Sequence, residues 1–156
     1  MRKLKKVIAK FLKYGTLVSS LGFIIAICIQ IYARFFLESA PSWTEEAARF
    51  FFIYAVSFGA GLAMKDDYYV QFDVLFNRIS KEKQLIIKLI VNCFTIVLFI
   101  ILAVFAVQFV IVGIPEHSPS LAVPMAFAFI SMVIMGVSVA LFSFFELLKN
   151  LKNLRH

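Results

Sequence analysis

Four long apolar runs constrain most tightly what this chain can fold into. A helix needs about 20 residues, with a range of about 17–25, to cross a bilayer. The runs cover roughly residues 15–37, 44–64, 85–112 and 121–145. The chain is 62% hydrophobic and 16% charged, whereas soluble domains are about 45–50% apolar and about 25% charged. We therefore predict an all-α integral membrane protein with four transmembrane helices in a single domain over residues 1–156.

The positions of Lys and Arg predict the orientation of these spans. Six lie in the N-terminal segment, four lie in the connector between spans two and three, and three lie in the C-terminal tail. The other two loops, 38–44 and 113–120, contain none. Cytoplasmic loops are enriched in these cations, so we expect both termini in the cytoplasm. The chain has a net charge of +7. Because the cationic clusters flank apolar spans, we expect them to bind lipid headgroups, and we expect no nucleic-acid partner.

The first span could instead be a cleavable signal peptide. Its apolar run is long for that role, and its exit, "FFLESAPSW", is a poor cleavage site. We expect the first span to be retained.

Two segments have the pattern of amphipathic helices at the membrane surface. In the connector between spans two and three, apolar residues recur at helical spacing beside a polar side that includes Asp73 and Asn77. These apolar residues are Tyr69, Phe72, Phe76 and Ile79. The alternative is a plain connector whose aromatic side chains dip into the headgroup layer. The N-terminal basic run has apolar residues between its lysines and is the second such segment.

Charged residues stand at the start of span two, in "PSWTEEAAR". Ser42 and Glu45 have capping-box spacing, and Trp43 suits the interface between lipid and water. Arg49 lies three residues after Glu46 and four after Glu45, so either carboxylate can reach it on one helix face. One interpretation is that these charges pair only with each other at the end of the helix. The other is that they contact a partner, because charges within membranes seldom face lipid.

Small residues predict where helices pack closely. In span two, Ala55, Gly59 and Ala63 recur every four residues. Gly22 and Ala26 repeat this spacing in span one, and Gly136 and Ala140 repeat it in span four. Small residues at this spacing allow two backbones to approach each other.

Signatures of chemistry are missing from the sequence. There is no phosphate-binding Gly-rich loop with its Lys, and the two histidines are far apart. We therefore expect no catalytic site, no metal and no cofactor. The polar residues deep in the spans are uncharged, which favours a membrane scaffold over a substrate conduit.

Three other interpretations stay open. A small homodimeric proton-coupled antiporter would need a carboxylate embedded in span one, where Glu38 is the only nearby acid. A membrane enzyme or heme-carrying anchor would need histidines within the spans. The membrane anchor of an unrelated complex is not excluded by any residue.

Three motifs, in order along nearly the whole chain, resemble the small membrane (Q) subunit of tripartite ATP-independent periplasmic (TRAP) transporters. The first is "PSWTEEAARFFFIYAVSFGAGLAMK", and the second is "YVQFDVL" with Asp73. The third is "SPSLAVPMAFAF", which places Pro119, Leu121 and Pro124 in a Ser-Pro-x-Leu-x-x-Pro turn. Tyr69 stands where the family often has His, which argues against a pH-linked role at that position.

The resemblance implies a non-catalytic subunit of a bacterial cytoplasmic membrane transporter. In such systems a large multi-span subunit carries the substrate by an elevator-like motion driven by a cation gradient, usually sodium. A soluble periplasmic protein captures the substrate, typically an organic acid such as a C4-dicarboxylate or sialic acid. The small subunit would stabilise the large one and help dock the periplasmic protein. By that resemblance Trp43, Glu45, Glu46 and Arg49 would face the large subunit.

Overall fold

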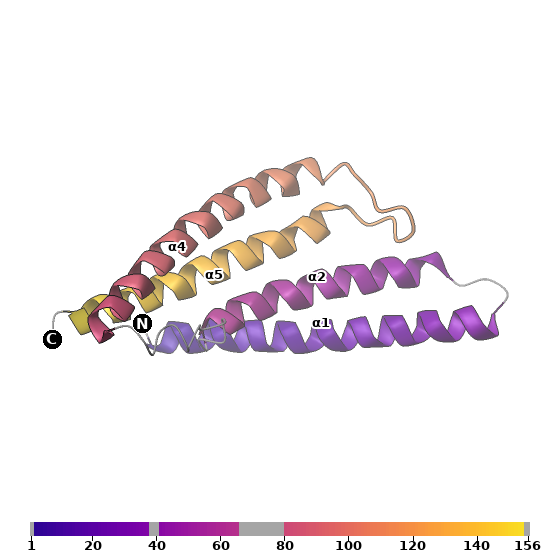
Figure 1. Cartoon of the computed structure of the whole chain (residues 1–156). Coiled ribbons are helices and arrows are strands. Elements are labelled where there is room, and N and C mark those ends of the chain that lie inside the picture. Colours follow the sequence, from indigo (N-terminus) through magenta and orange to yellow (C-terminus); the bar gives the residue numbers. More distant parts are fainter. Residues whose placement is uncertain (1, 38–40, 66–79, 155–156) are drawn as a thin grey trace.

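The computed structural model describes residues 2–37, 41–65 and 80–154, and its described regular elements are helices (Figure 1). The helices are α1 (Arg2–Phe36), α2 (Ser42–Lys65), α4 (Lys81–Val112) and α5 (Ala126–Leu154). All four are long and apolar enough to cross a membrane. This confirms the predicted all-α fold with four spans. The expected surface helix between spans two and three, including Asp73, falls largely on residues 66–79, which lie outside the described residues.

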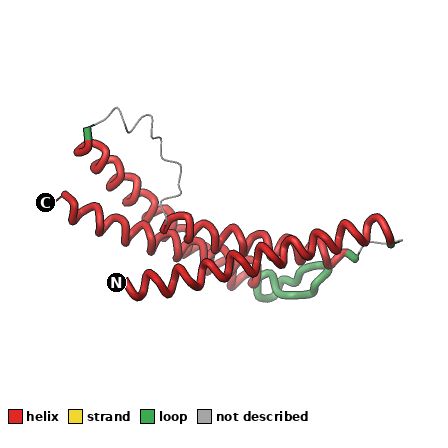
Figure 2. The backbone as a smooth tube through the Cα atoms, turned by 90° about the horizontal axis from the view of Figure 1, so that it is seen from below, coloured by secondary structure: helices red, strands yellow, loops and turns green. Residues whose placement is uncertain are grey.

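The helices form two hairpins that lie side by side. Helix α1 packs against α2, α4 packs against α5, and α2 also packs against α5. The resulting order in space is α1, α2, α5, α4 (Figure 1). The start of α1 and the end of α5 lie at one end of the molecule in both views, here called the terminal end (Figure 2). The opposite end holds the connection between α4 and α5, residues 113–125, and is here called the loop end.

Glycines let the helices approach one another closely. A Cβ atom on Gly15 would lie 2.7 Å from the Phe58 ring, which is closer than van der Waals contact allows. A Cβ atom on Gly61 of α2 would lie 2.6 Å from the Ser138 Cβ atom of α5. The α1–α2 and α2–α5 contacts therefore depend on positions that have no side chain.

The buried core lies where three helices meet. It consists of Ala9 and Leu12 of α1, Phe58 of α2, and Phe142 and Phe145 of α5. Leu12 is only 1% exposed. Many large apolar side chains elsewhere on the helices are exposed, as expected of a surface that faces lipid or a partner.

Helix α1 joins the basic N-terminal segment and the first span into one continuous helix of 35 residues. The expected N-terminal surface helix is therefore not a separate element. Gly15, where a break could occur, stays helical and packs against Phe58. The amphipathic pattern is present within the helix, since Ala9 and Leu12 are buried while Lys10 and Lys13 are exposed. Whether this part of α1 lies in the membrane surface stays a prediction.

Helix α5 begins at Ala126 and continues to Leu154, whereas the apolar run suggests a span over residues 121–145. Residues 121–125 instead belong to the loop that precedes the helix. Pro124 has no N–H group, and its carbonyl accepts a hydrogen bond from the Phe127 amide at 3.1 Å. The proline thus marks the entry into the helix.

Candidate functional site

Glu45 and Arg49 form an ion pair near the start of α2. The Arg49 Nη2 atom lies 3.2 Å from the Glu45 Oε1 atom, one helical turn away. The side chain of Arg49 is 70% exposed, and that of Glu45 is 66% exposed. An exposed pair of this kind contributes at most about 1 kcal/mol to stability, so the fold does not require it.

The pair lies at the edge of a hollow between α1 and α2, with a volume of about 320 Å³. Apolar and polar side chains share this hollow. Phe23, Ile27 and Gln30 line it from α1, and Glu45, Ala48, Arg49 and Phe52 line it from α2. The arrangement places a cation and a carboxylate on a mostly apolar face, where a partner could bind them.

The start of α2 does not use the expected capping box. The Glu45 carboxylate pairs with Arg49, and no bond between it and Ser42 is present among the described residues. The Thr44 hydroxyl instead donates to the Pro41 carbonyl at 2.8 Å. Thr44 is fully buried, which fixes the first turn of the helix.

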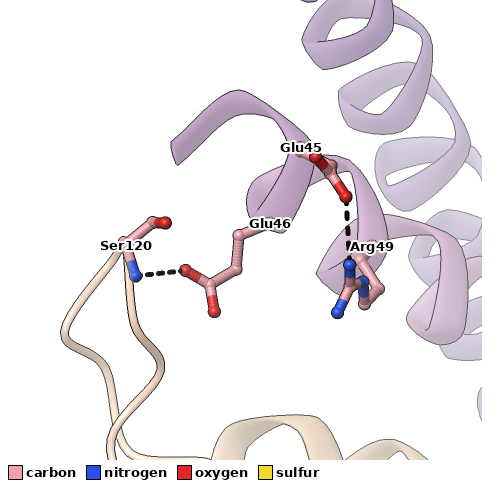
Figure 3. A network of polar contacts seen from close by, with 4 residues as sticks. All are labelled: Glu45, Glu46, Arg49 and Ser120. Atoms are coloured by element: carbon pink, nitrogen blue, oxygen red, sulfur yellow. Dashed lines mark hydrogen bonds and ion pairs between the residues drawn. The ribbon is translucent and has the colours of Figure 1, made fainter. Parts of the chain in front are cut away.

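Glu46 points away from Arg49 and toward the loop between α4 and α5 (Figure 3). Its Oε2 atom accepts two hydrogen bonds, from the backbone amides of Ser120 at 2.9 Å and Leu121 at 2.8 Å. The Ser120 amide belongs to a residue 74 positions further along the chain. Glu46 therefore connects the first hairpin to the loop of the second.

The loop is itself a small hairpin. His117 and Pro124 form an isolated antiparallel bridge, and the Met125 amide donates to the Glu116 carbonyl at 2.8 Å. The loop approaches α5 closely at Gly113, where a Cβ atom would lie 2.6 Å from the Phe129 ring. These contacts build a defined structure at the loop end.

A second polar contact joins α2 to the start of α5. The Tyr54 hydroxyl donates to the Phe127 carbonyl at 2.7 Å. Tyr54 lies two turns beyond Glu46 on α2, and Gly61 meets Ser138 two turns further on. We call the three contacts of Glu46, Tyr54 and Gly61 the α2–α5 seam.

The structure places the other predicted site residues as follows. Trp43 is 44% exposed at the start of α2. Ala55, Gly59 and Ala63 are half-buried, and a Cβ atom on Gly59 would meet only Thr16 Cγ2, at an ordinary 3.9 Å. Within residues 2–37, 41–65 and 80–154, no group of three His, Cys, Asp or Glu side chains could hold a metal ion.

Sequence reasoning did not identify three features of the structure: the amides that bind Glu46, the Tyr54 bond and the tight packing at Gly61. The first two involve backbone atoms distant in sequence, which no motif specifies. Gly61 did carry a signal, as a small residue beside the Ala55–Ala63 series.

A family model described as "Tripartite ATP-independent periplasmic transporters, DctQ component" matches residues 23–153. The chain belongs to this family. It is also 24% identical over 150 residues to a Haemophilus influenzae protein named "Putative TRAP transporter small permease protein", with 96% of this chain and 91% of that protein covered. A second H. influenzae protein of the same name is 26% identical over 117 residues, covering 74% of this chain and 72% of that protein.

Membership makes this chain the small membrane component of a TRAP transporter. Two of the motifs that carried the resemblance meet in the structure of this small subunit. Glu46 comes from the first motif, and the loop with Pro119, Leu121 and Pro124 comes from the third. The family motifs at the loop end therefore form one connected site.

Proposed function

We propose that this TRAP small subunit is a non-catalytic scaffold for a cation-gradient-driven transporter of organic acids. It binds and stabilises a large elevator-type membrane subunit, and sodium is the expected coupling ion. The substrate is expected to be a C4-dicarboxylate or a sialic acid, captured by a soluble periplasmic protein that the small subunit helps to dock. Both termini lie in the cytoplasm of a bacterial cell, and the loop end faces the periplasm.

The exposed Glu45–Arg49 pair is the observation that carries this proposal. Both side chains project from an apolar helix that is long enough to span the membrane. Charged groups in a membrane-spanning helix are costly unless they are paired and shielded from lipid, and they usually face protein or water. A large subunit that covers the hollow beside Arg49 would supply that environment.

The proposal is tested by purification of the complex from the native host. A tag after His156 and a mild detergent should recover a large multi-span membrane subunit at near one-to-one stoichiometry, identified by mass spectrometry. Recovery of this chain alone, as a dimer that catalyses flux in liposomes, would favour the homodimeric antiporter and overturn the proposal. Recovery with an unrelated complex would instead identify a membrane anchor.

Substitution of Arg49→Ala tests whether the large subunit binds the face of α2 that carries Arg49. Loss of one partner from a buried, hydrogen-bonded charge pair costs about 2–5 kcal/mol, so we expect about 30-fold weaker association with the large subunit. The yield of the complex and the rate of uptake should fall together. Arg34→Ala is the matched control, because Arg34 is an exposed arginine near the end of α1 that does not line the hollow. Unchanged yield and uptake for Arg49→Ala would show that the partner binds elsewhere.

A further inference from the structure

The tip of the loop between α4 and α5, residues 118–122, has an unusual arrangement of backbone amides. The Ser118 amide donates to the Val123 carbonyl at 2.9 Å, and the Ala122 amide donates to the Ser118 carbonyl at 3.1 Å. Pro119 has no amide hydrogen. The two remaining donors of the tip, at Ser120 and Leu121, both point to the Glu46 carboxylate.

The residue that follows these two amides has an unusual backbone conformation. Ala122 has a φ of 53°, in the left-handed region that non-glycine residues seldom occupy. Two successive N–H groups that point to the same side, as those of Ser120 and Leu121 do, form a small anion-binding concavity. Glu46 supplies the anion from a different helix.

The base and the tip of the loop are held in different ways. The base is tied to α4 and α5, since the Ala126 amide donates to the Gly113 carbonyl at 3.0 Å and the Met125 amide donates to Glu116. The tip instead projects toward α2, where the Glu46 carboxylate accepts a hydrogen bond from the Ser120 amide (Figure 3) and another from the Leu121 amide. Removal of the carboxylate would leave the base and the two backbone hydrogen bonds of the tip intact, and would free the tip from α2.

We propose that Glu46 is a positioning residue that holds the tip in the conformation that docks the periplasmic substrate-binding protein. The inference rests on the proposed function, in which the loop end faces the periplasm. Both hydrogen bonds that the Glu46 carboxylate accepts come from the tip, so Glu46 acts through the loop. The surface that Glu46 holds in place includes Pro119 and Ser120 at the tip, and Glu116 and His117 just before it in the chain. All four residues are exposed.

This role differs from that of the adjacent Glu45. Glu45 pairs with Arg49 on its own helix and does not contact the loop. Substitutions at the two positions remove the same charge from the same turn of α2. They therefore separate the effect of loop positioning from the effect of lost negative charge.

The first measurement is hydrogen–deuterium exchange of the assembled transporter, followed for the amides of Ser120 and Leu121. In Glu46→Ala, we expect their exchange to become about tenfold faster, because each loses a charge-assisted hydrogen bond. In the complex that still forms, Glu45→Ala should leave the exchange of these two amides unchanged, because Glu45 pairs with Arg49 and not with the loop. Glu46→Gln keeps a carbonyl acceptor without the charge and should give an intermediate rate. Unchanged exchange in Glu46→Ala would overturn the inference.

The second measurement is uptake at increasing concentrations of the purified binding protein. In Glu46→Ala, we expect half-maximal uptake to need about tenfold more binding protein, with the maximal rate retained. Co-purification of the large subunit should also be retained. Faster exchange with an unchanged concentration dependence would show that the ordered tip does not serve docking, and would overturn the inference.

These readouts separate the inference from the proposed function. If the unsubstituted chain does not bind a large subunit at all, the proposed function fails at the purification step. If it does bind one but Glu46→Ala loses it, Glu46 contacts the large subunit or maintains the fold, and the inference about docking is wrong.

Discussion

At the scale of single residues, the two glutamates at the start of α2 bind different parts of the molecule. Successive residues on a helix are about 100° apart around its axis, so Glu45 and Glu46 cannot share one partner easily. Glu45 reaches Arg49 one turn along the same helix, and Glu46 reaches the loop amides. The Glu45–Arg49 pair is exposed on the surface of the chain. The hydrogen bonds of Glu46 connect α2 to the loop between α4 and α5.

Tyr54 makes the other side-chain hydrogen bond of the α2–α5 seam, and Tyr54→Phe tests it. The hydroxyl donates to the Phe127 carbonyl at 2.7 Å, and its loss should cost about 0.5–1.5 kcal/mol of stability. The thermal unfolding midpoint in mild detergent should fall accordingly. Tyr32→Phe is the control, since the Tyr32 ring is 59% exposed and stacks on Phe36 at 4.7 Å. An equal shift in both variants would show that the Tyr54 bond contributes nothing specific.

The site residues show how far the sequence can predict such contacts. The spacing placed Arg49 within reach of both glutamates on one helix, and the structure shows the pair with Glu45. The same spacing argument allowed Glu46 to pair with Arg49, and the structure does not bear that out. Glu46 instead accepts hydrogen bonds from two backbone amides more than 70 residues away in the sequence. Only the tertiary structure brings these groups together.

At the scale of elements, helix packing depends on which small residue faces a neighbour. The sequence predicts a small-residue series at Ala55, Gly59 and Ala63. Of the two glycines of α2, however, it is Gly61 whose added Cβ atom would clash with α5. Spacing identifies a face where packing is feasible, and the rotation of the helix decides which residue touches. That rotation is fixed by both neighbours of α2 together, so it is not readable from α2 alone.

Gly61→Ala and Gly59→Ala form a matched pair that tests this packing. A Cβ atom on residue 61 would lie 2.6 Å from Ser138 Cβ and 3.0 Å from Leu12 Cδ1. Overpacking of this kind costs about 1–3 kcal/mol, so the unfolding midpoint of Gly61→Ala in mild detergent should fall. A Cβ atom on residue 59 has ordinary space, so Gly59→Ala should leave the midpoint unchanged or raise it. The reverse order would mean that α2 is rotated differently in the membrane.

At the scale of the whole molecule, the α2–α5 seam is the main connection between the two hairpins. Its contacts pair Glu46 with Leu121 of the loop, Tyr54 with Phe127, and Gly61 with Ser138. The partners thus advance together along α2 and along the loop and α5. Helices α2 and α5 therefore run in the same direction. The number and order of the spans could be predicted from hydropathy, but this lateral arrangement could not, because each apolar span can pack against any other.

The parallel course of α2 and α5 is consistent with the predicted topology, which a labelling experiment can test. Both helices would run from the periplasm to the cytoplasm, since the segments at the terminal end carry the lysines and residues 113–120 carry none. In a variant whose Cys28 and Cys93 are replaced by Ser, single cysteines are introduced as Glu116→Cys, Lys3→Cys or Lys152→Cys. A membrane-impermeant maleimide should label Glu116→Cys in cells with a permeabilised outer membrane. It should label the other two several-fold more after the inner membrane is opened. Labelling of Lys3→Cys before that step would invert the topology, place the Glu46 site in the cytoplasm, and exclude its contact with a periplasmic protein.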